Sequence, residues 1–159
     1  MKVLIVDDNN DDRKILRYYI ESQGNQVIEA GNGEEGLSMA RTHKPDMIIS
    51  DALMPVMDGF NFLRNVKKDE ALSLTPFVFY SSVYRGDKDV DLALSIGAEA
   101  YMYKPKDPQE FWDELNVIID KGFNEKKGNT ELIEDEEEYL RRYSNIVATK
   151  LEEKVRELQ

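Results

Sequence analysis

The chain of 159 residues is long enough for one domain with a hydrophobic core and a small appendage. Its net charge of -11 argues against binding to nucleic acid, because it would be repelled by the phosphates. No apolar run approaches the roughly 18 residues of a membrane span, and the start of the chain does not resemble a signal peptide. We therefore expect a cytoplasmic protein without a membrane segment. The lack of cysteine also excludes disulfides and thiolate metal sites.

Five short apolar or β-branched runs are predicted to be strands, and each is followed by a stretch with helical periodicity. The strands are predicted at residues 2–6, 26–30, 46–50, 77–81 and 100–103, and the clearest helical stretches at 15–24, 32–43, 59–68, roughly 88–97 and 107–122. Strands that alternate with helices predict an α/β fold, with a five-stranded parallel sheet and helices on both faces.

Capping signals mark the start of two of these helices. Asn32 and Glu35 have the spacing of a capping box at the start of the second helix. In the fifth helix, Asp107 is the expected N-cap, Pro108 the first helical residue and Glu110 the third. These signals support the alternating pattern independently of its hydrophobic periodicity.

The end of the first predicted strand carries dense negative charge. Asp7 and Asp8 follow the strand directly, and Asp11 and Asp12 come shortly after them. Asp11 and Asp12 fit the electropositive first turn of a helix that begins near Asn10. Asp7 and Asp8 precede that helix. Because two carboxylates about 4 Å apart repel by about 4 kcal/mol at a protein surface, these two need another explanation.

Further polar residues mark the ends of later strands. Asp51 follows the third strand, Ser81 and Ser82 end the fourth, and Lys104 follows the fifth. In open α/β sheets, ligands bind beyond the carboxyl ends of the strands. We therefore expect these side chains to meet Asp7 and Asp8 at one edge of the sheet.

The acids at this edge suit a hard divalent cation. Asp7, Asp8 and Asp51 offer only oxygen ligands, which favours Mg²⁺, or Mn²⁺ in its place. A carboxylate beside such a cation can act as the nucleophile that takes up a phosphoryl group. Lys104 would place a positive charge on a phosphate oxygen, and Ser81 would supply a hydroxyl donor.

These residues lie in motifs that resemble the receiver domain of two-component response regulators. The resemblance covers residues 1 to about 122 and rests on VDD at 6–8, SDALMPVMDG at 50–59, YSS at 80–82 and GAEAYMYKP at 97–105. It implies a CheY-like, flavodoxin-like sheet of strand order 2-1-3-4-5. That order is a known property of the family and does not follow from the residues themselves.

The resemblance also implies how the site works. Asp51 would accept a phosphoryl group from a histidine kinase or a phosphotransfer protein. Asp8 and Asp51 would bind Mg²⁺ directly, together with the backbone carbonyl of Leu53, and Asp7 would bind it through water. Such a protein is a switch that controls a protein partner or an attached output. It is not an enzyme, although it assists its own phosphotransfer and dephosphorylation.

The remaining site residues belong to the switch. In the family, the residue at Ser81 swings towards the phosphate, the aromatic at Tyr101 follows it inward, and the lysine at Lys104 contacts the phosphate. Ser82 matches a small residue that admits the phosphoryl group. The peptide bond between Lys104 and Pro105 is expected to be cis.

Two other functions fit parts of this pattern. A haloacid-dehalogenase-type phosphatase needs a second acid two residues after a nucleophilic aspartate on the first strand, and here Asn9 and Asn10 occupy those positions. The other alternative is a receiver-like interaction module that works without phosphorylation. The presence of both Asp51 and Lys104 argues against it.

The sequence changes in character after Gly122. Residues 123–130 are predicted to be a polar linker, and residues 131–159, which lack proline and glycine, a long helix with Thr130 as its N-cap. An apolar stripe along that helix comprises Leu140, Tyr143, Val147, Leu151, Val155 and Leu158. We interpret the stripe as a possible coiled-coil surface for a homodimer through residues 131–159. The alternative is a helix folded back over the last strand and helix of the receiver.

Overall fold

The computed structural model describes residues 1–122, 133 and 135–158. Its five strands are all parallel and lie in the order β2-β1-β3-β4-β5. They are β1 (Lys2–Val6), β2 (Gln26–Ala30), β3 (Met47–Ser50), β4 (Phe77–Ser81) and β5 (Ala100–Tyr103). The predicted fold class and strand order are therefore confirmed. In register, Val6 lies opposite Ser50, so β1 and β3 end at the same level of the sheet.

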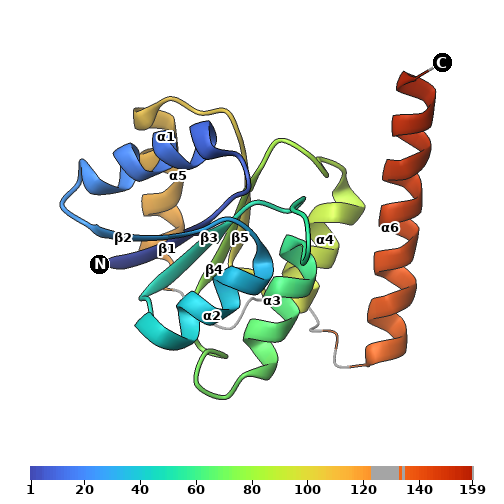
Figure 1. The fold of residues 1–159 in the computed structure, drawn as a ribbon, viewed down its shortest axis with the longest axis horizontal. Coiled ribbons are helices and arrows are strands. Elements are labelled where there is room, and N and C mark those ends of the chain that lie inside the picture. Colours follow the sequence, from blue (N-terminus) through green and yellow to red (C-terminus); the bar gives the residue numbers. More distant parts are fainter. Residues whose placement is uncertain (123–132, 134, 159) are drawn as a thin grey trace.

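Helices cover both faces of this sheet, as Figure 1 shows. On one face lie α1 (Asn10–Glu21) and α5 (Pro108–Asp120), and on the other lie α2 (Gly33–His43), α3 (Gly59–Lys68) and α4 (Asp87–Ile96). Each layer encloses its own group of buried apolar residues, because successive side chains of a strand point to opposite faces. Val3 and Ile5 pack beneath α1 and α5, whereas Leu4 and Val6 pack on the other face.

The predicted N-cap residues of α2 and α5 are both in place, and the reciprocal bonds of a capping box are seen at α5. The side chain of Asn32 accepts a hydrogen bond from the backbone N–H of Glu35, which satisfies a donor in the first turn of α2. At α5, Asp107 and Glu110 form the reciprocal capping box, with Pro108 as the first helical residue. These contacts fix where the two helices begin.

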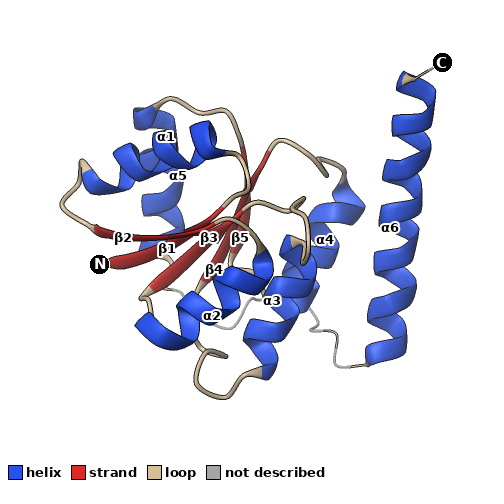
Figure 2. Ribbon diagram, viewed as in Figure 1, coloured by secondary structure: helices blue, strands red, loops and turns tan. Residues whose placement is uncertain are grey.

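A sixth helix, α6 (Glu136–Glu157), lies beside α4 on the side away from the sheet (Figure 2). Its N-cap is Asp135, whose side chain accepts a hydrogen bond from the backbone N–H of Glu137. The predicted start at residue 131 is therefore too early, because Ile133 and Asp135 are not helical. The backbone N–H of Ile133 instead donates to the carbonyl oxygen of Ser95 in α4, at 2.8 Å. The predicted linker 123–130 and the Thr130 cap lie outside the described residues.

The first half of α6 is folded back onto the receiver. Tyr139 and Ile146 are buried, and the Tyr139 hydroxyl donates to Oδ1 of Asn61 at 2.7 Å. The Tyr143 hydroxyl donates to the carboxylate of Asp58, the N-cap of α3. The folded-back alternative is thus correct in kind, but it named the last strand and helix, whereas the hydrogen bonds and ion pairs described between α6 and the receiver are made with α3, its N-cap Asp58 and α4.

An ion pair, a cation–π contact and an edge-on ring contact add to this contact. The guanidinium of Arg64 lies 4.3 Å from the centre of the Tyr139 ring and 2.7 Å from the carboxylate of Glu136. The ring of Phe60 packs edge-on against Tyr143, with 6.3 Å between the ring centres.

Among the described helices, α6 included, none is long and apolar enough to cross a membrane.

Candidate functional site

The loop after β1 places Asp7 inside the sheet edge. The backbone N–H of Asp7 donates to the carbonyl oxygen of Ala30 at 3.1 Å, which extends the hydrogen bonding between β1 and β2. The carboxylate of Asp7 accepts a hydrogen bond from the backbone N–H of Asn9 at 2.9 Å. The side chain is almost fully buried. Burial raises the pKa of Asp7, and the nearby Asp51 carboxylate raises it further, although bonds from Lys104 and Asn9 oppose this shift. Asp8, the next residue, is exposed.

Asp51 lies just beyond the end of β3 and is also buried. Its backbone N–H donates to the carbonyl oxygen of Val6 at 2.9 Å, and its Oδ1 accepts the backbone N–H of Ala52 at 2.6 Å. The chain turns tightly here, since the N–H of Gly59 returns to the carbonyl oxygen of Ala52 at 2.8 Å. A Cβ at position 59 would lie 2.2 Å from the Asp51 carbonyl oxygen, so only glycine fits.

Lys104 joins these acids from the end of β5. Its Nζ lies 2.7 Å from the carboxylate of Asp7 and 2.9 Å from that of Asp51. Burial alone would lower the pKa of Lys104, but the surrounding carboxylates outweigh burial and hold the pKa above its usual range. The amine is therefore a cation at neutral pH. The peptide bond between Lys104 and Pro105 is cis.

A third carboxylate, that of Asp12, lies 2.9 Å from the Lys104 amine. Asp12 was predicted only as a first-turn residue of a helix, and that explanation is incomplete. Asp12 does occupy the first turn, where its backbone N–H is capped by Asn9. The position of Asp12 could have been predicted from the sequence, because α1 begins shortly after the end of β1 and its first turn therefore lies at the same edge of the sheet.

The predicted metal ligands lie together. Oxygen atoms of Asp7, Asp8 and Asp51 all lie within 4.8 Å of one another. In the pair between Lys104 and Asp7, the pKa of both groups is raised, so Lys104 is favoured as a cation whereas the negative charge on Asp7 is disfavoured. One ammonium shared by several carboxylates cannot compensate them all, so the all-oxygen cluster fits an added divalent cation. Leu53, the predicted carbonyl ligand, is partly exposed on the adjoining loop.

The hydroxyl residues of β4 lie on the next strand. Ser81 is fully buried, and its hydroxyl oxygen accepts the backbone N–H of Val83 at 3.2 Å. Ser82, by contrast, is exposed.

Tyr101 on β5 lies inward in this structure. It is 9% exposed, and its ring stacks on Phe79 with 5.2 Å between the ring centres. Burial raises the pKa of Tyr101. Ser81 lies near the Tyr101 hydroxyl, but the geometry falls short of a hydrogen bond, so this buried hydroxyl has no partner among the described residues. The predicted inward movement of Tyr101 stays a prediction, because the ring is already covered here.

Comparisons with known proteins identify the family of the domain. Residues 3–116 match the model of the response regulator receiver domain. Protein PilH of Pseudomonas aeruginosa is 32% identical over 120 residues, which are 74% of this chain and 97% of PilH. The alkaline phosphatase synthesis transcriptional regulatory protein PhoP of Bacillus subtilis is 33% identical over 120 residues, again 74% of this chain. The aligned region spans only 48% of PhoP.

The fold has the same relatives among solved structures. The chemotaxis response regulator CheY4 of Vibrio cholerae superimposes with a TM-score of 0.69 and 30% identity, over 74% of this chain and 97% of CheY4. The family match ends before α6, so the sixth helix lies outside the shared domain. Over the sheet and its five helices, the chain belongs to the response regulator receiver domain family.

Proposed function

We propose that the protein is a phosphoacceptor switch in which Asp51 takes up a phosphoryl group from a histidine kinase or a phosphotransfer protein. The observation that supports this most strongly is the arrangement around the Asp51 carboxylate. A lysine cation lies at 2.9 Å, and two further carboxylates stand close enough to share a divalent cation. An oxygen-only cluster with an adjacent ammonium is suited to phosphoryl transfer.

The proposed step forms one bond and breaks one. A carboxylate oxygen of Asp51 attacks the phosphorus of a phosphohistidine, and the phosphorus–nitrogen bond breaks, so that its electron pair leaves with the imidazole. Asp7, Asp8 and the Leu53 carbonyl would hold Mg²⁺ or Mn²⁺ together with Asp51. When bound, the cation neutralises charge that builds up on the phosphoryl oxygens. Lys104 is placed to bind one of these oxygens.

Ser81 is the proposed switch residue. Phosphorylation adds about two negative charges and three acceptor oxygens, and bonds to such a charged group contribute about 1.5 to 3 kcal/mol each. Two new bonds, from Ser81 and Lys104, give about 3 to 6 kcal/mol, against the about 5.5 kcal/mol needed to invert a 1:99 equilibrium. We expect Ser81→Ala to accept the phosphoryl group but to show smaller chemical-shift changes around Tyr101. Equal changes in both proteins would contradict this role.

Incubation with acetyl phosphate and Mg²⁺ tests the acceptor. The intact mass of the wild type should rise by one phosphoryl group, and no rise is expected after removal of the metal or in Asp51→Asn. Asp113→Asn, which alters an exposed acid on α5, is the matched control and should be labelled like the wild type. An unlabelled wild type, under conditions that label another receiver, would favour the phosphorylation-independent interaction module instead.

The proposed partners are proteins. The family relationship points to a histidine kinase or a phosphotransfer protein as the donor, and the net charge of -11 disfavours nucleic acid. A homodimer through residues 131–159 would need a face of α6 that the receiver leaves uncovered.

A further inference from the structure

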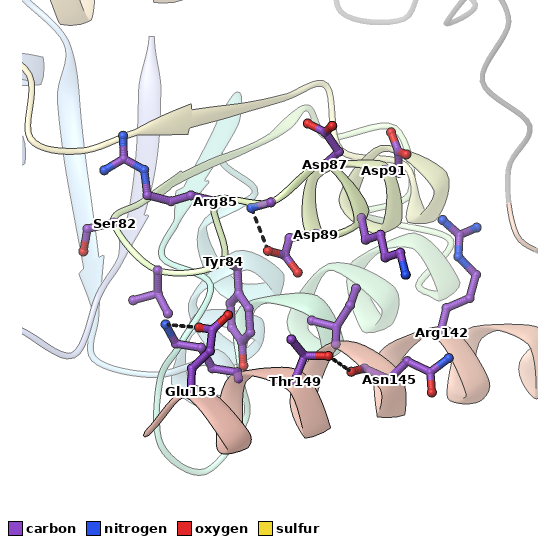
Figure 3. Close-up of a pocket in the computed structure, with 15 residues that line it drawn as sticks. Ser82, Tyr84, Arg85, Asp87, Asp89, Asp91, Arg142, Asn145, Thr149 and Glu153 are labelled. Carbon is purple, nitrogen blue, oxygen red and sulfur yellow. Dashed lines mark hydrogen bonds and ion pairs between the residues drawn. The ribbon is translucent and has the colours of Figure 1, made fainter. Parts of the chain in front are cut away.

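The helix α6 has two faces with different surroundings. Figure 3 shows one of them: Arg142, Asn145, Thr149 and Glu153 line a cavity of about 750 Å³ between α6 and the segment from Ser82 to Asp91. This face continues the contact made by Tyr139 and Ile146, so it is turned towards the receiver.

The other face carries most of the apolar stripe predicted from the sequence, whereas Tyr143 belongs to the docked contact with Asp58 and Phe60. Leu140, Leu151, Val155 and Leu158 are 51%, 64%, 49% and 88% exposed, while Val147 and Tyr143 are partly covered. Four large apolar side chains thus remain in solvent along about 27 Å of one helix, at 1.5 Å per residue. Scattered apolar residues need no explanation, but Leu151, Val155 and Leu158 follow one another at about one turn and form a contiguous exposed patch, which suggests an interface.

The spacing of this row is symmetric about Thr149. With the docked Tyr143 included, the steps from Leu140 to Leu158 are 3, 4, 4, 4 and 3, so the sequence of apolar positions is the same from either end. If two copies of α6 lie antiparallel about a two-fold axis near Thr149, Leu140 faces Leu158 of the other copy and Val147 faces Leu151. The same surface then serves both copies, as a two-fold interface requires.

The remaining charges of α6 favour this orientation over the parallel one. Its first turn carries Glu137 and Glu138 beside Glu136, which is paired with Arg64 and Lys68. Its last turn carries Arg156 beside Lys154, which is paired with Glu157. A parallel pair would bring the two acidic turns together. An antiparallel pair separates them, places each near the basic turn of the other copy, and sets the helix dipoles in opposite directions.

We infer that the outward face of α6 binds a second copy of this chain as an antiparallel helix pair, while the inward face stays docked on α3 and α4. This interface is independent of Asp51 and goes beyond the proposed phosphoacceptor function. A single pair of short helices makes a small interface, so the dimer should be weak and form in the high micromolar range.

The first test measures association. Light scattering and sedimentation of the full chain should show a monomer–dimer equilibrium, equally in the wild type and in Asp51→Asn. Leu151→Asn should raise the dissociation constant by about tenfold or more, because the side chain occurs twice in a two-fold interface. Thr149→Asn on the inward face is the matched control and should leave it unchanged. A monomeric wild type at several hundred micromolar, or equal effects of both variants, would overturn the inference.

The second test measures orientation, and the absence of native cysteine makes it clean. A mixture of Leu140→Cys and Leu158→Cys chains, distinguished by a size tag, should form a mixed disulfide under mild oxidation. Leu158→Cys alone should cross-link no better than Arg156→Cys, which lies off the stripe. Efficient cross-linking of Leu158→Cys to itself would show a parallel pair and overturn the antiparallel arrangement.

Discussion

The strand-end site with Asp7, Asp8, Asp12, Asp51 and Lys104, here called the acidic edge, contains more negative than positive charge. In the contact of α6 with α3 and α4, here called the α6 contact, polar groups are mostly paired. At the acidic edge, the Lys104 amine is shared by the carboxylates of Asp7, Asp12 and Asp51. At the α6 contact, hydroxyl donors and carboxylate or amide acceptors are matched, as with Tyr139 and Asn61. The first region thus keeps negative charge that a ligand can use, whereas the second is largely satisfied and serves to hold a helix in place.

The two regions are nevertheless close in the chain. Asp58, which accepts a hydrogen bond from Tyr143 of α6, precedes the glycine that packs against the backbone of Asp51. Variants that separate the two regions therefore show which properties belong to each.

The largest loss in the free energy of unfolding is expected when Lys104 is replaced. Removing one partner of a buried ion pair commonly costs about 3 to 5 kcal/mol, because the carboxylates of Asp7 and Asp51 lose their nearest cation. We expect Lys104→Met to lower the free energy of unfolding by about 3 kcal/mol in chemical denaturation. Lys106→Met, which removes a more exposed pair with Glu114, is the control and should cost at most about 1 kcal/mol. Similar losses in both variants would show that the edge does not depend on this cation.

The next largest effect is expected when Tyr139 is replaced, and it should be confined to the stability of α6. Tyr139 is 1% exposed, and truncation of a buried aromatic typically costs about 3 to 5 kcal/mol. In Tyr139→Ala, amide exchange across α6 should accelerate by roughly a hundredfold, since each 1.4 kcal/mol is a factor of ten. Exchange in β1 and β3 should change little. Unchanged exchange in α6, or the same acceleration in the exposed control Tyr18→Ala, would contradict the docking contact.

A smaller effect of opposite sign is expected at Tyr101. Its buried hydroxyl lacks a partner among the described residues, whereas the Tyr80 hydroxyl accepts the backbone N–H of Lys106 at 3.2 Å. An unsatisfied buried group costs about 1 to 3 kcal/mol. Tyr101→Phe should therefore raise the free energy of unfolding by about 1 kcal/mol, while Tyr80→Phe should lower it. A loss of stability in both variants would mean that the Tyr101 hydroxyl is satisfied.

The smallest effect concerns the pH dependence of α6 docking. Arg64 and Lys68 lower the pKa of Glu136 below its ordinary value of 4.5. A depressed pKa means that the charged form favours the docked state, so this contribution is complete above pH 4.5 and is lost as pH falls through the lowered pKa. The difference in α6 exchange between the wild type and Glu136→Gln should shrink on acidification. A difference that grows at low pH would reverse the assigned sign.

The acidic edge could be predicted because the topology of a parallel sheet alone determines where its strands end. In a parallel sheet, every strand end reaches the same edge, so Asp7, Asp51 and Lys104 could be brought together without any knowledge of packing. Asp12 was missed as a partner of Lys104 because its helix-start position already had a sufficient local explanation.

The face of α6 that docks on the receiver could not be predicted from the sequence. The predicted stripe, with Leu140 and Leu151, is more apolar than the face that docks, which combines Tyr139 and Ile146 with polar residues. The docking partners, such as Asn61, lie far away in the sequence and carry no local signal of the contact. Periodicity located the helix but could not decide which of its faces the receiver would cover.

Of the acids at this edge, we propose that Asp51 alone carries the phosphoryl group. Borohydride reduces an aspartyl phosphate to homoserine and so marks the acceptor permanently. After phosphorylation with acetyl phosphate and Mg²⁺, reduction and peptide mapping should find homoserine at position 51 and leave Asp7, Asp8 and Asp12 unmodified. Homoserine at any of those three positions, or at none, would contradict the proposed function.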